Sequence, residues 1–182
     1  MEVRGTVPAE GGYLLAANHV SWLDPAALGS ACPRQIRFVI ARAIYDDPKQ
    51  RWFYRGMRTI PIRDEGAADQ RALREAIRAL RRGELVGIFP EGAGLDPEGR
   101  PRVARGGAAV LARGARVPVI PVAIEGTHRA LPKGRLVPRP VRLRVTFGEP
   151  FLPAGGAVKA NVARLDLADE MMRRILALQA AP

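Results

Sequence analysis

Short apolar runs alternate with helix-type segments along the whole 182-residue chain, and this alternation constrains the fold more than any other feature. Runs of strand length fall at residues 13–17, 36–40, 59–62, 85–89, 117–124 and 141–147. Helix-type segments fall at 25–31, 41–57 with an interruption at Pro48, 65–82, 103–113 and 158–179. The pattern predicts an α/β fold: a single layered domain, residues 1–182, with a mixed, mostly parallel sheet flanked by helices.

Local patterns predict further details of the packing. Asp24 and Pro25 suit the cap and first turn of the first helix. Pro118 and Pro121 cannot donate to a strand ladder, so strand 117–124 is expected to be an edge strand or an irregular one. Helical spacing places four apolar residues on one face of the last helix: Val162, Leu165, Met172 and Ile175.

The charge of the chain is strongly basic. Lys+Arg 29 against Asp+Glu 18 gives a net charge of +11. A field of this sign attracts nucleic acid, anionic bilayers or phosphorylated small molecules, and charge alone does not choose among them. Aromatic residues make up only 5% and no nucleic-acid motif occurs, so we expect no nucleic-acid partner.

Other features bear on the compartment. A single Cys32 excludes an internal disulfide framework and fits a reducing compartment. The longest stretch without charged side chains, residues 11–23, is shorter than the roughly 20 apolar residues of a membrane span. The N-terminus lacks the apolar core of a secretory signal, so we expect a cytoplasmic protein.

A histidine and an aspartate mark the loop after the first strand-type run. His19 follows residues 13–17, and Asp24 lies five residues further on, at the start of a predicted helix. A neutral imidazole accepts a proton near neutral pH if a carboxylate fixes its tautomer and stabilises the cation. Asp24 can do this if the turn folds back, and the imidazole then activates a substrate hydroxyl directly. Taken alone, the spacing also suits a capping aspartate beside a histidine in a turn.

A second motif, Phe-Pro-Glu-Gly, follows the run at 85–89. Gly92 allows close backbone approach to a ligand, and Glu91 lies at the same sheet edge as His19 if both strands are parallel. Glu91 can then bind a polar group of an acceptor or orient an anion-binding loop. The alternative is an ordinary turn with a solvated carboxylate.

Three arginines, Arg55, Arg58 and Arg63, surround the strand-type residues 59–62. Guanidinium groups suit phosphate recognition, so one of them is a candidate to hold a phosphate group of a ligand. A solvated basic surface is the alternative. No credible cluster of metal ligands is present in the sequence, and we expect no metal or cofactor.

Four blocks in order, NHVSWLDP, RTIPIRD, FPEG and VPVIPVAIEGT, resemble the motifs of the lysophosphatidic-acid-acyltransferase-like family of glycerolipid acyltransferases. The similarity covers residues 3–153. It implies that His19 is the general base, that Asp24 holds it, and that the acyl donor is acyl-CoA or acyl carrier protein. It also implies that Glu91 and Gly92 belong to the acceptor-binding region and that an arginine of the second block, Arg63 or Arg58, contacts the phosphate of a lysophospholipid.

Two departures from the family pattern concern the acceptor. Asp64 stands where the family usually has the arginine, with Arg63 one place earlier. Ala93 and Gly94 replace the usual Thr-Arg after Pro-Glu-Gly. A catalytically silent lipid-binding domain is therefore an alternative to the enzyme, and a nucleic-acid-binding module is a more remote one.

The resemblance implies a lipid substrate, and one segment suits a membrane surface. Trp52, Phe53 and Tyr54 lie between Arg51 and Arg55, which combines interfacial aromatic rings with cations. We expect a peripheral protein that contacts an anionic membrane from the cytoplasmic side. Packing of these rings in the core is the competing interpretation.

Overall fold

The computed structural model describes residues 1–48, 51–63, 69–92, 107–132, 135, 137–153 and 160–180. The strands are β1 (Glu2–Arg4), β2 (Tyr13–Ala17), β3 (Ile36–Ala41), β4 (Ile60–Ile62), β5 (Leu85–Ile88), β6 (Val119–Glu125) and β7 (Arg144–Phe147). The helices are α1 (Asp24–Ala31), α2 (Arg42–Tyr45), α3 (Arg51–Gly56), α4 (Gln70–Arg81), α5 (Gly107–Ala115), α6 (Thr127–Ala130) and α7 (Ala160–Ala180).

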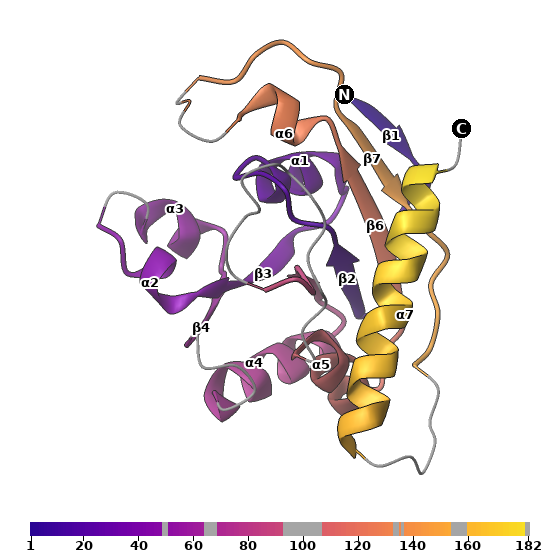
Figure 1. Cartoon of the computed structure of the whole chain (residues 1–182). Coiled ribbons are helices and arrows are strands. Elements are labelled where there is room, and N and C mark those ends of the chain that lie inside the picture. Colours follow the sequence, from indigo (N-terminus) through magenta and orange to yellow (C-terminus); the bar gives the residue numbers. More distant parts are fainter. Residues whose placement is uncertain are drawn as a thin grey trace.

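The strands form one seven-stranded sheet in the order β1-β7-β6-β2-β5-β3-β4. Strands β6, β2, β5, β3 and β4 are mutually parallel, whereas β7 is antiparallel to β6 and β1 is parallel to β7. The predicted mixed, mostly parallel sheet is confirmed. Parallel strands end at one edge, so the loops after β2, β5 and β6 meet there. We call this the carboxyl edge; in Figure 1, β2 points up toward it and α1 and α6 lie above.

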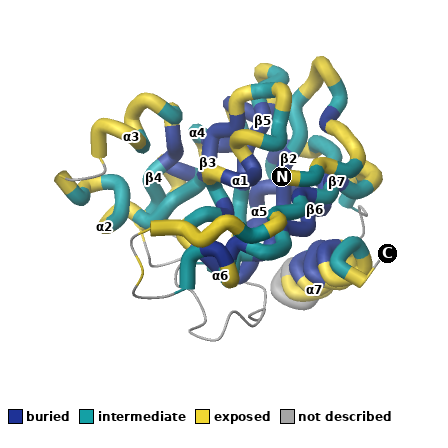
Figure 2. Tube along the Cα trace, turned by 90° about the horizontal axis from the view of Figure 1, so that it is seen from above, coloured by how far each residue is buried: buried dark blue, intermediate teal, exposed yellow. Residues whose placement is uncertain are grey.

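Helices cover both faces of the sheet (Figure 1). Alternate residues of β2 point to opposite faces. Leu14 and Ala16 pack with buried residues of α4, α5 and α7 in one apolar cluster. Leu15 and Ala17 pack on the other face in a second cluster that includes Ala27 and Leu28 of α1. Figure 2 shows that the buried side of α7 is turned toward the sheet.

The prolines of β6 do not put this strand at an edge. β6 lies between β7 and β2, so the expectation of an edge strand was wrong, whereas the irregularity is present. Two residues separate Val119 from Val122, but three separate their partners Phe151 and Phe147. The extra residue lies within 148–150, opposite Pro121, whose carbonyl accepts from the N–H of Gly148 at 2.9 Å. The missing N–H of Pro121 therefore falls where the ladder to β7 is already interrupted.

The last helix also differs from its prediction. Met172 and Ile175 are buried as expected, but Leu165 is 55% exposed, and Val162 lies outside the residues whose side chains are described. Ala168 and Met171 complete the buried face instead. The spacing of apolar residues alone does not distinguish the side of the helix that is buried from the adjacent side that carries Leu165.

Other boundaries differ in smaller ways. The sequence does not predict strand β1, because three residues are too few to show an alternation of apolar and polar side chains. Helix α4 begins after Asp69, whose carboxylate accepts from the N–H of Ala72. Residues 65–68, at the start of the helix predicted over 65–82, lie outside the described residues. Residues 103–106, at the start of the helix predicted over 103–113, also lie outside them. Cys32 packs against the second apolar cluster, and burial raises the pKa of its thiol.

Candidate active site

The loop after β2 begins with a side chain that extends the sheet. Asn18 is 1% exposed. Its Nδ2 donates to the carbonyl of Ile124 at 2.9 Å, and its Oδ1 accepts from the Ile124 N–H at 2.7 Å. The amide therefore takes the place of one more backbone pairing between β2 and β6. This fixes the direction in which the chain leaves β2, one residue before His19.

Replacement of Asn18 by Ala is expected to destabilise the protein by about 2–6 kcal/mol. Both backbone groups of Ile124 lose their partner in a buried place, and each unsatisfied group costs roughly 1–3 kcal/mol. Urea unfolding followed by circular dichroism measures the change. A loss below about 1 kcal/mol would show that the two hydrogen bonds do not hold this loop.

The imidazole of His19 contacts the carboxylate of Asp24. His19 Nδ1 and Asp24 Oδ2 are 3.0 Å apart, and the side chain of Asp24 is fully buried whereas that of His19 is 13% exposed. With its proton on Nδ1, the ring donates to the carboxylate and leaves Nε2 as the basic nitrogen. The contact predicted from the five-residue spacing is therefore present.

Asp24 holds the turn as well as the ring. Its Oδ2 accepts from the N–H groups of Val20 and Ser21, both at 2.7 Å. Asp24 is the first residue of α1 rather than its cap, because the N-cap position is Leu23 and no side chain caps the helix. The carboxylate thus folds back over the loop instead of capping the helix. Three donors converge on one of its oxygens.

The turn after β5 supports His19 from the other side. Glu91, 1% exposed, accepts the backbone N–H of His19 on Oε1 at 3.1 Å. The rings of Phe89 and His19 stack with centroids 4.1 Å apart and an interplanar angle of 19°. Gly92 has a φ of 80°, which favours glycine, and its N–H donates to the Phe89 carbonyl at 3.0 Å to close the turn. The solvated carboxylate considered for Glu91 is excluded.

The arginines of the second block do not lie together. Arg63 follows β4 at the carboxyl edge, is exposed, and donates its backbone N–H to Asp69 at 3.2 Å. Arg58 precedes β4, where its φ of 52° turns the chain; its carbonyl accepts from Arg37, and its guanidinium lies 3.9 Å from Glu84. Glu84 precedes β5, at the opposite edge of the sheet. The structure therefore brings Arg63, but not Arg58, to the edge that carries His19.

Some predicted features of the acceptor site cannot be placed. Asp64, Ala93 and Gly94 lie outside the described residues. Among the residues that are described, no group of three or more His, Cys, Asp or Glu side chains is arranged to hold a metal ion.

Sequence reasoning assigned no role to Asn18 or Phe89, although both belong to the quoted blocks. A polar amide directly after an apolar strand, and an aromatic ring directly before the Pro-Glu-Gly turn, were the available signals. Their roles follow from the strand order. Because β2 lies between β5 and β6, Asn18 is placed beside Ile124 of β6 and His19 beside Phe89 after β5. The result is a buried Asp24, an oriented imidazole and a supporting Glu91, an arrangement suited to removing a proton from a bound hydroxyl.

Comparisons with known proteins point to one family. The model of the family described as "Acyltransferase" matches residues 1–125, which include β1 to β6 and the residues shown above to contact His19. The chain belongs to this acyltransferase family, in its lysophosphatidic-acid-acyltransferase-like branch.

Individual relatives define the branch. The chain is 25% identical to a 1-acyl-sn-glycerol-3-phosphate acyltransferase of Bacillus subtilis, over 92% of this chain and 81% of the relative. It is 32% identical to a lyso-ornithine lipid O-acyltransferase of Pseudomonas aeruginosa, over 72% of this chain and 50% of that one. The crystal structure of PlsC from Thermotoga maritima, a 1-acyl-sn-glycerophosphate acyltransferase, superimposes with a TM-score of 0.76 at 27% identity, covering 100% of this chain and 73% of that one.

Proposed function

We propose that this acyltransferase moves a fatty acyl group from acyl-CoA or acyl carrier protein to the free hydroxyl of lysophosphatidic acid or a related lysophospholipid. The observation that carries the proposal is the contact between His19 and the buried Asp24 at the carboxyl edge of the sheet. Similarity to 1-acyl-sn-glycerol-3-phosphate acyltransferases supports the acceptor class.

The chemistry requires one proton to move twice. Nε2 of His19 takes the proton of the acceptor hydroxyl as its oxygen attacks the thioester carbonyl. The C–O bond forms, the C–S bond breaks, and the imidazolium returns the proton to the departing thiolate. The buried carboxylate of Asp24 stabilises the imidazolium between these two steps, as in a catalytic triad that lacks the enzyme nucleophile.

Acceptor recognition falls to groups at the same edge. Arg63 is exposed next to the end of β4 and is our candidate for the phosphate of the lysolipid. We do not propose this role for Arg58, because its guanidinium lies near Glu84 at the other edge. Gly92, in the left-handed turn, leaves room for close approach of the acceptor to the backbone.

Glu91 is proposed to position His19 through the backbone. Replacement by Gln keeps an oxygen that accepts the His19 N–H, whereas replacement by Ala removes it. We expect kcat to fall less than about tenfold for Glu91→Gln and about 10²-fold for Glu91→Ala, because small displacements of a base are costly. An equal loss of kcat in both variants would instead show that the negative charge of Glu91 is what catalysis requires, through direct contact with the acceptor.

The test of the proposed function is release of free thiol from a long-chain acyl-CoA in the presence of single lysophospholipids. The panel contains lysophosphatidic acid, lyso-ornithine lipid and lysophosphatidylethanolamine, with acyl carrier protein as the second donor. Release that depends on one of these acceptors is the expected result. Hydrolysis at the same rate without acceptor, or no release with any donor and acceptor, would refute the proposal.

A further inference from the structure

We infer that the exposed side of helix α3 is a docking surface for an anionic lipid bilayer. The surface consists of Arg51, Trp52, Phe53 and Arg55, called the α3 surface below. None of the six residues of α3 is buried. Trp52 is 74% exposed and Phe53 is 43% exposed, so these two rings are not buried in the core, whereas Tyr54 is partly buried.

The aromatic rings of α3 contact one another. The rings of Trp52 and Phe53 meet edge to face with centroids 6.0 Å apart, and those of Phe53 and Tyr54 do the same at 5.4 Å. Edge-to-face contacts of this kind are favourable, and they leave Trp52 and Phe53 accessible to solvent. Exposed tryptophan and phenylalanine side chains of this kind insert at the boundary between the polar lipid headgroups and the apolar acyl chains.

The charge of the α3 surface complements an anionic membrane. Arg51 and Arg55 are exposed, and neither forms an ion pair with any residue that the structure describes. Two acidic residues precede α3. The carboxylate of Asp46 lies 2.8 Å from the guanidinium of Arg42, and burial, followed by the charge of Asp47, raises the pKa of Tyr54. Two cations without an ion-pair partner in the described part of the chain therefore flank the two exposed rings. Each arginine near an anionic bilayer contributes about 1 kcal/mol of binding free energy.

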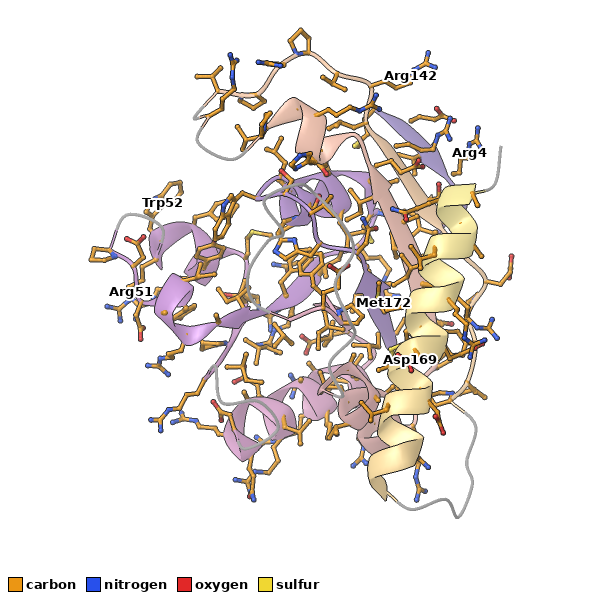
Figure 3. All side chains as sticks on the ribbon, in the orientation of Figure 1. Arg4, Arg51, Trp52, Arg142, Asp169 and Met172 are labelled. Carbon is orange, nitrogen blue, oxygen red and sulfur yellow. The ribbon has the colours of Figure 1, made fainter. Side chains whose placement is uncertain are left out.

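The α3 surface suits a bilayer better than a protein or nucleic acid. A stable protein interface buries about 800 Å² on each partner, far more than one six-residue helix offers. A lipid surface needs only projecting rings and cations, and it makes no demand for shape complementarity. Helix α2 begins directly after the carboxyl end of β3, and α3 follows it. Figure 1 shows both helices beside that edge, and Figure 3 shows Trp52 and Arg51 at the outer side of the molecule.

Intrinsic fluorescence tests the inference without any acyl transfer. The chain has two tryptophans, so Trp22→Phe leaves Trp52 as the sole reporter. Vesicles of phosphatidylcholine that contain roughly 30 mol% of the anionic lipid phosphatidylglycerol, comparable to an anionic membrane leaflet, are added at low salt. We expect the emission of Trp52 to shift to shorter wavelength, and the shift to weaken as salt is raised.

Charge removal on and off the α3 surface supplies the matched control. Arg51→Ala with Arg55→Ala is expected to weaken binding to these vesicles about 25-fold, or about fivefold for each arginine. Arg78→Ala with Arg116→Ala removes the same charge from exposed residues near the opposite edge and should change binding less than about twofold. Circular dichroism establishes that each variant is folded.

Three results would overturn the inference. The first is an unchanged Trp52 emission at vesicle concentrations that bind the protein, since another face would then be the contact. The second is equal weakening of vesicle binding by the two pairs of arginine substitutions. The third is a Trp52 shift with acyl carrier protein or RNA but none with vesicles. Activity toward a short-chain, monomeric lysophosphatidic acid is measured in parallel with Trp52→Ala. Retained activity with lost vesicle binding is expected, and it separates this surface from the proposed catalysis.

Discussion

His19→Ala is expected to lower acyl transfer by about 10²–10⁴-fold, the contribution that a general base makes to such a step. The reason is that Nε2 is the one basic atom of this residue left available when Nδ1 faces Asp24 at 3.0 Å. Thiol release from acyl-CoA with saturating acceptor measures kcat. The variant should fold normally, because Asp24 keeps the N–H groups of Val20 and Ser21 as donors.

The second histidine provides the control for this substitution. His128 lies on α6, which also follows a parallel strand at the carboxyl edge, and the proposed mechanism gives it no part. His128→Ala should keep activity within about threefold of the wild type, a change smaller than 1 kcal/mol in the barrier. Loss of activity in His128→Ala with retention in His19→Ala would transfer the role of base to the other ring.

Asp24→Asn is expected to lower kcat by about 10⁴-fold while largely preserving the fold, as the equivalent change does in a catalytic triad. Three donors meet at Oδ2, and Oδ1 accepts no hydrogen bond among the described residues. An asparagine can place its amide oxygen at the Oδ2 position and keep all three donors. The substitution therefore removes the charge that stabilises the imidazolium but spares the turn.

Asp24→Ala separates these two contributions. It leaves the N–H groups of Val20 and Ser21 without their shared acceptor, and each unsatisfied buried donor costs about 1–3 kcal/mol. We expect Asp24→Ala to lose stability in thermal unfolding as well as activity, and Asp24→Asn to lose mainly activity. If Asp24→Asn retains more than a tenth of the wild-type kcat, the carboxylate charge does not assist His19.

The sequence predicted the layered fold and the contact at its centre because both depend on short-range signals. Apolar runs separated by helical spacing define strand and helix, and the strand order of a parallel sheet brings their carboxyl ends together. The five residues from His19 to Asp24 are enough for a carboxylate to fold back onto a ring. Neither the order of strands and helices nor the contact between His19 and Asp24 depends on predicting the ends of these elements to within a few residues.

Features that depend on three-dimensional pairing were not predictable. Strand 117–124 was expected to be an edge strand or an irregular one, and only the pairing shows which: β6 is interior, and Pro121 lies at an irregularity in its pairing with β7 and Phe151. Arg58 and Arg63 are five residues apart, but β4 between them carries them to opposite edges of the sheet. The bond between Asn18 and Ile124 joins residues 106 positions apart, and no local pattern specifies it.

The proposed role of His19 is tested by following two products of one reaction: free thiol from the acyl donor and acylated lipid from lysophosphatidic acid. With the wild-type protein, we expect the two products to accumulate in a one-to-one ratio and only when the acceptor is present. Both should fall together in His19→Ala. Thiol release without lipid product, or equal formation of both products by the wild type and by His19→Ala, would contradict direct activation of a lipid hydroxyl by the imidazole of His19.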